Sequence, residues 1–247
     1  MNIFKKILKQ SEYSNKKILL DNQFTYKDLH KLILEYSVFL KSKLKKGEII
    51  CLILPYSIDF MAIMVSARIN GNTLCVLNPD QTDFEKNYIF NQVNYSMIIS
   101  EKKINKKYQI LKKFYFYKKK EKIKKKLNQS DAFIIFTSGT TTNPKGAILT
   151  DDSIKNNIIG IINQLKLTTK DKTIIYSPPN YAMGISQVVT FLYLKSSFLF
   201  DLNGTKFVDN FLNKLKKNKI SILNLNIASF KFLKIFKKNF KIPSLKI

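Results

Sequence analysis

Hydrophobic and polar residues follow one another in blocks that predict strands and helices in turn. The run Ile49–Pro55 is continuously apolar, which is typical of a strand buried on both faces of a parallel sheet. Before it, Thr25 is expected to cap a helix that ends at Gly47, because Asp28 completes a capping-box pattern and apolar residues then recur at helical spacing. Short connections between such blocks predict an α/β fold with a mainly parallel, doubly wound sheet flanked by helices.

The same alternation predicts the other elements. Ser57 is expected to cap a helix that stops at Asn70-Gly71. Later helices are expected at 83–91, 151–165, from 185 onward, at 207–215 and at 228–236. Strands are expected at 73–79, 95–100, 132–136, 173–177, 197–200 and 220–226, with the first residues of another at 243–247.

Composition narrows the class of protein. Hydrophobic residues make up 45% of the chain, enough for a folded core. Cys51 and Cys75 lie inside apolar strand-like runs, which predicts buried, reduced thiols in a cytoplasmic protein and no disulfide. The N-terminal "MNIFKKILKQ" lacks the uninterrupted apolar region of a secretory signal. No apolar run approaches the roughly 18–20 residues that a membrane-spanning helix needs.

The formal net charge of +26 is distributed unevenly. Abundant Lys, Asn and Ile with a single arginine fit an AT-rich genome, so basicity by itself indicates little. Residues 101–126 hold 13 basic and 2 acidic residues, whereas residues 127–205 hold 6 and 5. The Lys-rich segment has two interpretations: a surface for anionic lipid or nucleic acid, or a solvated connector with Phe114 and Phe116 packed on the sheet. Missing arginines favour the connector, so no specific nucleic-acid partner is expected.

One loop differs from the rest of the chain. In "FIIFTSGTTTNPKGAIL", an apolar strand is followed by small hydroxyl residues between Gly139 and Gly146, and a helix is expected after Thr150. Backbone N–H groups and hydroxyls can donate to phosphate oxygens, and Lys145 adds a mobile positive charge. Composition alone leaves two interpretations open, a polyphosphate-binding loop and an ordinary polar loop.

Two familiar phosphate motifs are excluded. A Walker A loop requires Gly-Lys-Ser/Thr, but Lys145 stands between Pro144 and Gly146. A dinucleotide fingerprint requires three glycines at fixed spacing, which the loop does not have.

The order of residues in this loop resembles the phosphate-loop signature of the adenylate-forming superfamily, which includes acyl-CoA synthetases, peptide synthetase adenylation domains, D-alanyl carrier-protein ligases and luciferases. That signature reads Tyr/Phe-Thr-Ser-Gly-Ser/Thr-Thr-Gly-x-Pro-Lys-Gly. Further likeness in "FTYKDLHKLI", "GEIICLILPYSIDF", "SPPNYAMGIS" and "PSLKI" extends the resemblance over essentially the whole chain. The matching loop residues are Phe136, Thr137, Ser138, Gly139, Thr140, Thr141, Pro144, Lys145 and Gly146.

The resemblance implies an AMP-forming ligase that uses ATP to convert a carboxylic acid into an acyl-adenylate, and then passes the acyl group to the thiol of CoA or of a carrier protein. It implies that Tyr181 and Gly184, in "SPPNYAMGIS", lie near the acyl-substrate pocket; core packing is the alternative for Tyr181. It also implies that Mg²⁺ shares the phosphate charge. The residues implied to grip the ATP phosphates are Thr137, Ser138, Gly139, Thr140, Thr141, Thr142 and Lys145.

The chain also departs from the family pattern. Thr142 replaces the third loop glycine, and a β-branched residue resists positive φ. Asp151, with Asp152 beside it, replaces the histidine usual after the loop. Two interpretations are open: acids that suit the dipole at a helix N-terminus, and charges that repel a nearby phosphate. Family members continue beyond this length into segments that hold adenine, ribose and magnesium. We therefore expect residues 1–247 to form an incomplete N-terminal domain with a Lys-rich connector at 101–126, no C-terminal domain and no catalysis on its own.

Three functions remain open from the sequence. The first is the N-terminal part of an adenylate-forming ligase, as a fragment, a truncated gene product or one half of a split enzyme whose C-terminal half is separately encoded. The second is a non-catalytic remnant that binds a partner protein or a carrier domain. The third is a Lys-rich binder of membrane or nucleic-acid surfaces. No catalytic residue or protein metal ligand is assigned, and His30, the only histidine, is expected to be an ordinary surface or half-buried residue.

Overall fold

A seven-stranded sheet forms the larger part of the molecule, in the order β4-β5-β3-β1-β2-β6-β7. The four central strands, β3, β1, β2 and β6, are parallel. At one edge β5 runs antiparallel to β3 and β4, and at the other edge β7 runs antiparallel to β6. This arrangement confirms the mainly parallel sheet. The strands are β1 (Ile49–Ile53), β2 (Thr73–Val76), β3 (Met97–Ser100), β4 (Gln109–Leu111), β5 (Phe114–Lys118), β6 (Asp131–Thr137) and β7 (Lys145–Thr150).

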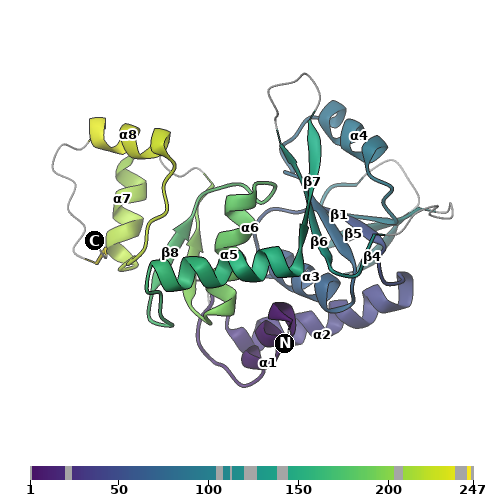
Figure 1. The fold of residues 1–247 in the computed structure, drawn as a ribbon, viewed down its shortest axis with the longest axis horizontal. Helices are drawn as coiled ribbons and strands as arrows, with labels where there is room; N and C mark the ends of the chain where they lie inside the picture. Colours follow the sequence, from purple (N-terminus) through teal and green to yellow (C-terminus); the bar gives the residue numbers. More distant parts are fainter. Residues whose placement is uncertain are drawn as a thin grey trace.

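Helices cover the sheet on both faces (Figure 1). The larger hydrophobic core lies between one face and helices α1, α2, α3, α5 and α6, and a smaller core lies under α4 on the other face. The helices are α1 (Ile3–Ser11), α2 (Tyr26–Lys43), α3 (Ile58–Ile69), α4 (Asp83–Gln92), α5 (Asp151–Gln164), α6 (Ala182–Tyr193), α7 (Val208–Lys217) and α8 (Ile227–Phe236).

A second, two-stranded parallel sheet pairs β8 (Lys172–Ile175) with β9 (Ser197–Phe200). It carries α7 and α8, which lie at the end of the molecule farthest from α4 in Figure 1. The computed structural model describes residues 2–19, 24–103, 108–111, 113–119, 127–137, 144–202, 208–236 and 244–245.

Local sequence accounts for the main helix starts. Thr25 forms the expected capping box, since its backbone N–H donates to the carboxylate of Asp28 at 2.8 Å. Ser57 accepts from the backbone N–H of Phe60 at 3.1 Å and begins α3. Thr150 caps α5, which places the helix directly after the hairpin that contains the polar loop. The two cysteines are buried, free and opposite one another in β1 and β2, as expected.

Several expectations need correction. The amphipathic helix α1 was not expected, although Ile3, Phe4 and Ile7 share its buried face. The segment 220–226 is not a strand, because only Ile222 forms a bridge, with Thr173. No strand is seen at the described residues 244–245, which form a turn and a bend.

The Lys-rich segment 101–126 includes two strands among its described residues. Its described residues form a hairpin of β4 and β5 that extends the large sheet. Phe114 and Phe116 are almost fully buried, as the connector interpretation required. Over the described parts of the chain, no helix has both the length and the apolar character needed to cross a membrane. His30 is half-buried, with Nδ1 3.1 Å from the carbonyl oxygen of Leu8.

Candidate functional site

The polar loop lies at the tip of an antiparallel hairpin. Phe136 pairs with Gly146, and the last described pair is Thr137 with Lys145. Lys145 is exposed at the mouth of the loop and begins β7. Strand β7, which was not predicted from the sequence, therefore lies between the loop and helix α5. The predicted phosphate ligands Ser138, Gly139, Thr140, Thr141 and Thr142 lie outside the described residues.

Two contacts fix the described end of this hairpin. A Cβ atom at Gly146 would lie 3.2 Å from Phe136 Cζ and 3.2 Å from Ile134 Cγ2, so glycine allows a close approach of β7 to β6. The Tyr88 hydroxyl of α4 lies 3.4 Å from the carbonyl oxygen of Pro144. The lysine at the loop mouth is thus carried by a strand at the edge of the sheet, which pairs with β6.

Asp151 lies at the opposite end of the hairpin from the loop, which corrects the interpretation that it repels bound phosphate. Lys145 is the first residue of β7, and Asp151 follows its last residue, six positions further along the chain. At a strand rise of about 3.3 Å per residue, the separation is about 20 Å. Interactions between charges at such a distance are largely screened at physiological salt.

The carboxylate of Asp151 is engaged elsewhere. Its Oδ1 lies 3.0 Å from Arg68 Nη2, and its Oδ2 accepts from Asn2 Nδ2 at 2.9 Å. Burial raises the pKa of Asp151 above its usual value, while Arg68 and Asn2 oppose that shift. Burial likewise lowers the pKa of Arg68, against the pull of Asp151. The pair is a structural connection between α3 and α5, away from the loop.

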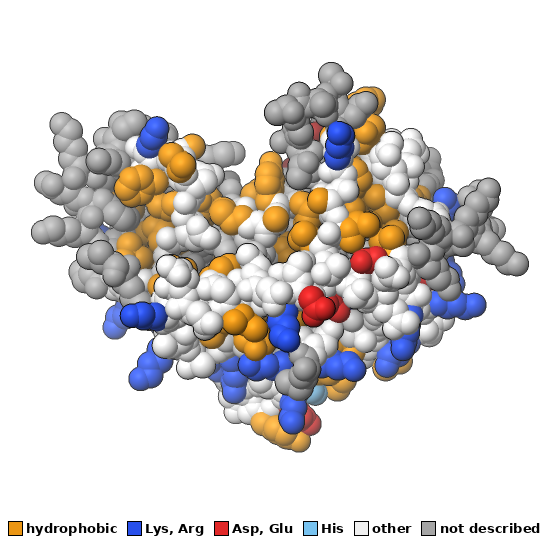
Figure 2. Space-filling view, viewed as in Figure 1, with side chains coloured by type: hydrophobic (Ala, Val, Ile, Leu, Met, Phe, Trp, Pro, Cys, Tyr) orange, Lys and Arg blue, Asp and Glu red, His pale blue; other side chains and the backbone are white. Residues whose placement is uncertain are grey.

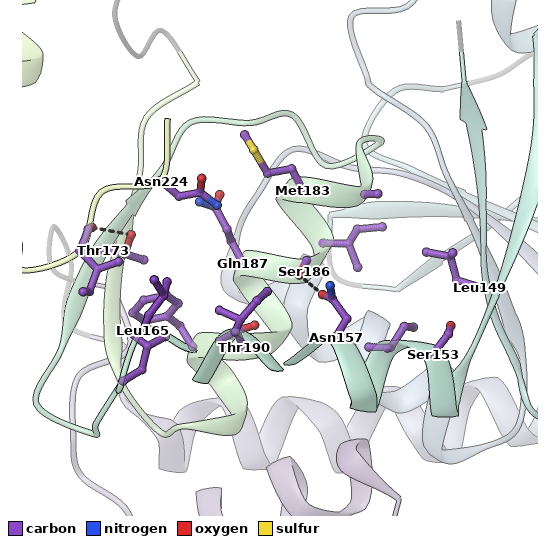
Figure 3. Close-up of a pocket in the computed structure, with 17 residues that line it drawn as sticks. Leu149, Ser153, Asn157, Leu165, Thr173, Met183, Ser186, Gln187, Thr190 and Asn224 are labelled. Atoms are coloured by element: carbon purple, nitrogen blue, oxygen red, sulfur yellow. Dashed lines mark hydrogen bonds between the residues drawn. The ribbon is translucent and has the colours of Figure 1, made fainter. Parts of the chain in front are cut away.

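Beside the hairpin, a cavity of about 420 Å³ lies between α5 and α6 (Figure 3). Leu149 of β7 lines one end, and Thr173 of β8 and Asn224 line the other. Figure 3 shows the hydrogen bond from Ser186 Oγ to Asn157 Oδ1, at 2.6 Å, between the two helices. Sequence reasoning did not find this cavity, because its walls come from segments that lie far apart in the chain.

The two predicted substrate-pocket residues occupy different positions on α6. Tyr181 is the N-cap residue and is 54% exposed, so core packing does not describe it. Its neighbours Ala182 and Met183 line the cavity. Gly184 is buried outside the lining, where a Cβ atom would lie 2.5 Å from the Pro178 carbonyl oxygen. Their contact with an acyl substrate stays a prediction.

The described residues offer Mg²⁺ no site of their own. Within these parts of the chain, no group of three or more His, Cys, Asp or Glu side chains could hold a metal ion. Neither Pro144 nor Lys145, at the described rim of the loop, can supply a carboxylate. Mg²⁺ is usually held by one or two carboxylates together with substrate phosphates. The described residues therefore do not fit a resident metal, whereas Lys145 fits a phosphate.

The face shown in Figure 2 is hollowed between β7 and α8. Hydrophobic side chains gather around the hollow, and lysines lie mostly along the opposite edge of the face. A ligand in the hollow meets an apolar environment with little general positive charge.

The mainly parallel sheet flanked by helices defines an α/β protein, in which the β6–β7 hairpin presents Lys145 at its described end. The family described as AMP-binding enzyme matches residues 9–242, and the chain belongs to that family. Its fold is that of the N-terminal domain of adenylate-forming enzymes.

Similar proteins agree with this assignment. Gramicidin S synthase 2 of Brevibacillus brevis is 22% identical over 223 residues, covering 86% of this chain and 5% of that protein. Bacitracin synthase 1 of Bacillus licheniformis is 25% identical over 206 residues, covering 83% of this chain and 4% of that protein. The chain thus spans a small part of the curated relatives that it matches.

Solved structures share the fold at low identity. A four-domain nonribosomal peptide synthetase bound to AMP and glycine has a TM-score of 0.79 at 16% identity, covering 94% of this chain and 18% of that one. An o-succinylbenzoate CoA synthetase of Bacillus subtilis, in complex with its acyl-adenylate intermediate, has a TM-score of 0.77 at 14% identity, covering 97% and 66%.

Proposed function

We propose that this chain provides the ATP-phosphate-binding part of an AMP-forming carboxylate ligase. The observation that carries the proposal is the pairing of Lys145 with Thr137 at the mouth of the signature loop. Because the lysine begins a paired strand, its backbone stands at the mouth of the loop, and its side chain is exposed there. An ammonium group that reaches a phosphate there would stabilise the negative charge that develops during reaction.

In the proposed reaction, a carboxylate oxygen of the acid attacks the α-phosphorus of ATP. The bond from that phosphorus to the bridging oxygen of the β-phosphate breaks, and pyrophosphate leaves with the electron pair. Lys145 would stabilise the negative charge on the leaving pyrophosphate. The acyl group then passes to a thiol of CoA or of a carrier protein, and AMP is released. The identity of the thiol and the supply of a C-terminal domain by a separate polypeptide belong to this proposal.

The binding test uses the full chain and two lysine variants. Lys145→Gln removes the charge at the loop mouth, and Lys170→Gln removes an exposed charge in the turn before β8. Loss of one charge-assisted hydrogen bond costs about 1.5–3 kcal/mol, so we expect Lys145→Gln to weaken ATP binding by about 10- to 100-fold. Lys170→Gln should leave it unchanged. An equal effect of both variants would show general charge attraction instead of a phosphate site.

The activity test is ATP–pyrophosphate exchange with a panel of carboxylic acids. It is run with the chain alone and with a family C-terminal domain supplied as a separate polypeptide. Exchange that appears only with both parts supports a divided ligase. Absence of exchange in both settings, together with ATP binding that depends on Lys145, supports the alternative of a non-catalytic remnant.

A further inference from the structure

The cavity between α5 and α6 has an uncharged wall as far as the described residues form it. The 17 described residues that line it include no Lys, Arg, His, Asp or Glu. Leu149, Ile154, Ile161 and Phe191 supply apolar surface. At about 420 Å³, the volume lies toward the small end of the roughly 300–1,000 Å³ typical of small-molecule sites. The space suits a compact, mostly apolar group.

Two polar side chains of the wall are buried without a partner. Gln187 is 6% exposed and Thr190 is 1% exposed, and both lie on the same face of α6 because they are three residues apart. Among the described residues, neither amide atom of Gln187 nor the hydroxyl of Thr190 has a hydrogen-bond partner. By contrast, Thr173 in the same wall donates to the carbonyl oxygen of Ile222 at 2.9 Å.

Unpaired buried groups favour a particular kind of ligand. The large majority of buried polar atoms in proteins are hydrogen-bonded. Each one left unpaired lowers the free energy of unfolding by about 1–3 kcal/mol. A neutral ligand group that both donates and accepts would satisfy Gln187 and recover part of that cost. An ammonium group would instead be buried in a wall that holds no carboxylate, which is strongly unfavourable.

The cavity is connected with the hairpin through one strand. Leu149 lines the cavity and Lys145 begins the same strand, four residues earlier. At about 3.3 Å per residue this places the two about 13 Å apart along β7. A ligand in the cavity and a phosphate at the loop mouth therefore lie at two points of one rigid element.

We propose that this cavity takes the acyl part of the acid that is activated. This acyl part is uncharged and largely apolar, and it carries a single hydroxyl or amide. The acid is therefore not an α-amino acid. The interpretation of this cavity as a substrate site rests on the proposed function. Glycine, which is bound in the peptide synthetase structure, is therefore not the expected substrate of this chain.

Matched acids test the proposal by calorimetric titration of the full chain without ATP. Phenylalanine differs from 3-phenylpropanoate only by its ammonium group, and 3-(3-hydroxyphenyl)propanoate and 3-(4-hydroxyphenyl)propanoate each add one hydroxyl. We expect phenylalanine to bind at least about tenfold more weakly than 3-phenylpropanoate, because its charge is unpaired. Of the two hydroxylated acids, the one that binds more tightly should bind about threefold to tenfold more tightly than 3-phenylpropanoate, because its hydroxyl satisfies a buried polar group.

Variants assign the effect to the cavity. Gln187→Leu should abolish the advantage of the hydroxyl and retain the discrimination against phenylalanine. Gln164→Leu, at the exposed end of α5 and outside the cavity wall, should leave both preferences unchanged. Thr190→Val provides a second, isosteric variant should Gln187→Leu fail to fold. Equal binding of phenylalanine and 3-phenylpropanoate, no binding of any acid, or equal effects of Gln187→Leu and Gln164→Leu would overturn the proposal.

The two proposals fail separately. If the acids bind with the expected preferences but Lys145→Gln does not change ATP binding, the proposed function is wrong. The cavity is then a site for an uncharged ligand group and not a substrate site. ATP binding that depends on Lys145, with no preference among the acids, would remove only the substrate inference.

Discussion

Arg68 Nη2 lies 3.0 Å from Asp151 Oδ1, and the arginine side chain is fully buried. The guanidinium also donates to the carbonyl oxygens of Asp131 and Gln129 at 2.9 Å, and to that of Asn72. One side chain thus joins the end of α3, the turn before β6 and the start of α5. The single arginine of a lysine-rich chain occupies a place where planar geometry with several donors is required.

Arg68→Met should destabilise the protein strongly, because it removes the positive charge that pairs with the partly buried Asp151 carboxylate and takes a donor from the carbonyl oxygens of Asn72 and Gln129. Removing one partner of a buried ion pair costs about 3–5 kcal/mol. Urea unfolding measures the loss. Asp152→Asn changes the charge at the same helix end on an exposed neighbour, and it should change stability by less than about 0.5 kcal/mol. A loss below about 1 kcal/mol for Arg68→Met would contradict the assigned role.

The capping box of α2 should stabilise the protein at neutral pH and lose this contribution in acid. The Thr25 hydroxyl and backbone N–H hold the pKa of Asp28 below its usual value of 3.8. Because the folded pKa is lower than the unfolded one, the stabilisation is complete above pH 3.8 and is lost as the pH falls through the folded value.

Thr25→Ala should cost about 1 kcal/mol at neutral pH and move the pKa of Asp28 back toward its usual value. Unfolding in urea measures the first effect, and an NMR titration of the Asp28 carboxyl measures the second. An unchanged titration midpoint in the variant would refute the hydrogen bond as the cause of the shift.

Two glycines should respond in opposite directions to the same substitution. A Cβ atom at Gly184 would meet the Tyr56 hydroxyl and would lie 2.9 Å from the Ser177 carbonyl oxygen, whereas nothing lies within 4 Å of a Cβ atom at Gly160. Gly184→Ala should therefore lose about 1–3 kcal/mol through overpacking. Gly160→Ala, inside α5, should gain about 0.5–1 kcal/mol. Thermal unfolding of the pair measures both, and equal shifts would argue against the close contact at Gly184.

The two buried threonines of the cavity wall should also differ. Thr190→Val removes a hydroxyl without a partner in the described structure, so stability should stay equal or rise by up to about 1 kcal/mol. Thr173→Val breaks a hydrogen bond to Ile222 and should cost about 1–3 kcal/mol. Chemical unfolding compares the two. A clear loss for Thr190→Val would mean that its hydroxyl is satisfied in solution.

The sequence by itself determined the features that depend on near neighbours. Thr25 and Ser57 cap their helices through residues three positions away, and continuous apolar runs such as Ile49–Ile53 became central parallel strands. The loop ending in Lys145 identified the family because its signature is contiguous, and the family match agrees.

The tertiary structure decided what depends on distant segments. The strand β7 has exposed or half-buried residues without alternation, so only pairing with β6 reveals it, and that pairing places Asp151 far from the loop. Arg68 and Asp151 are 83 positions apart in the sequence and form an ion pair only in the folded chain. The buried Gln187 lines a cavity only because α5 packs beside α6. Local patterns record caps and periodicity, whereas contacts between elements depend on how the whole sheet and its helices are arranged in space.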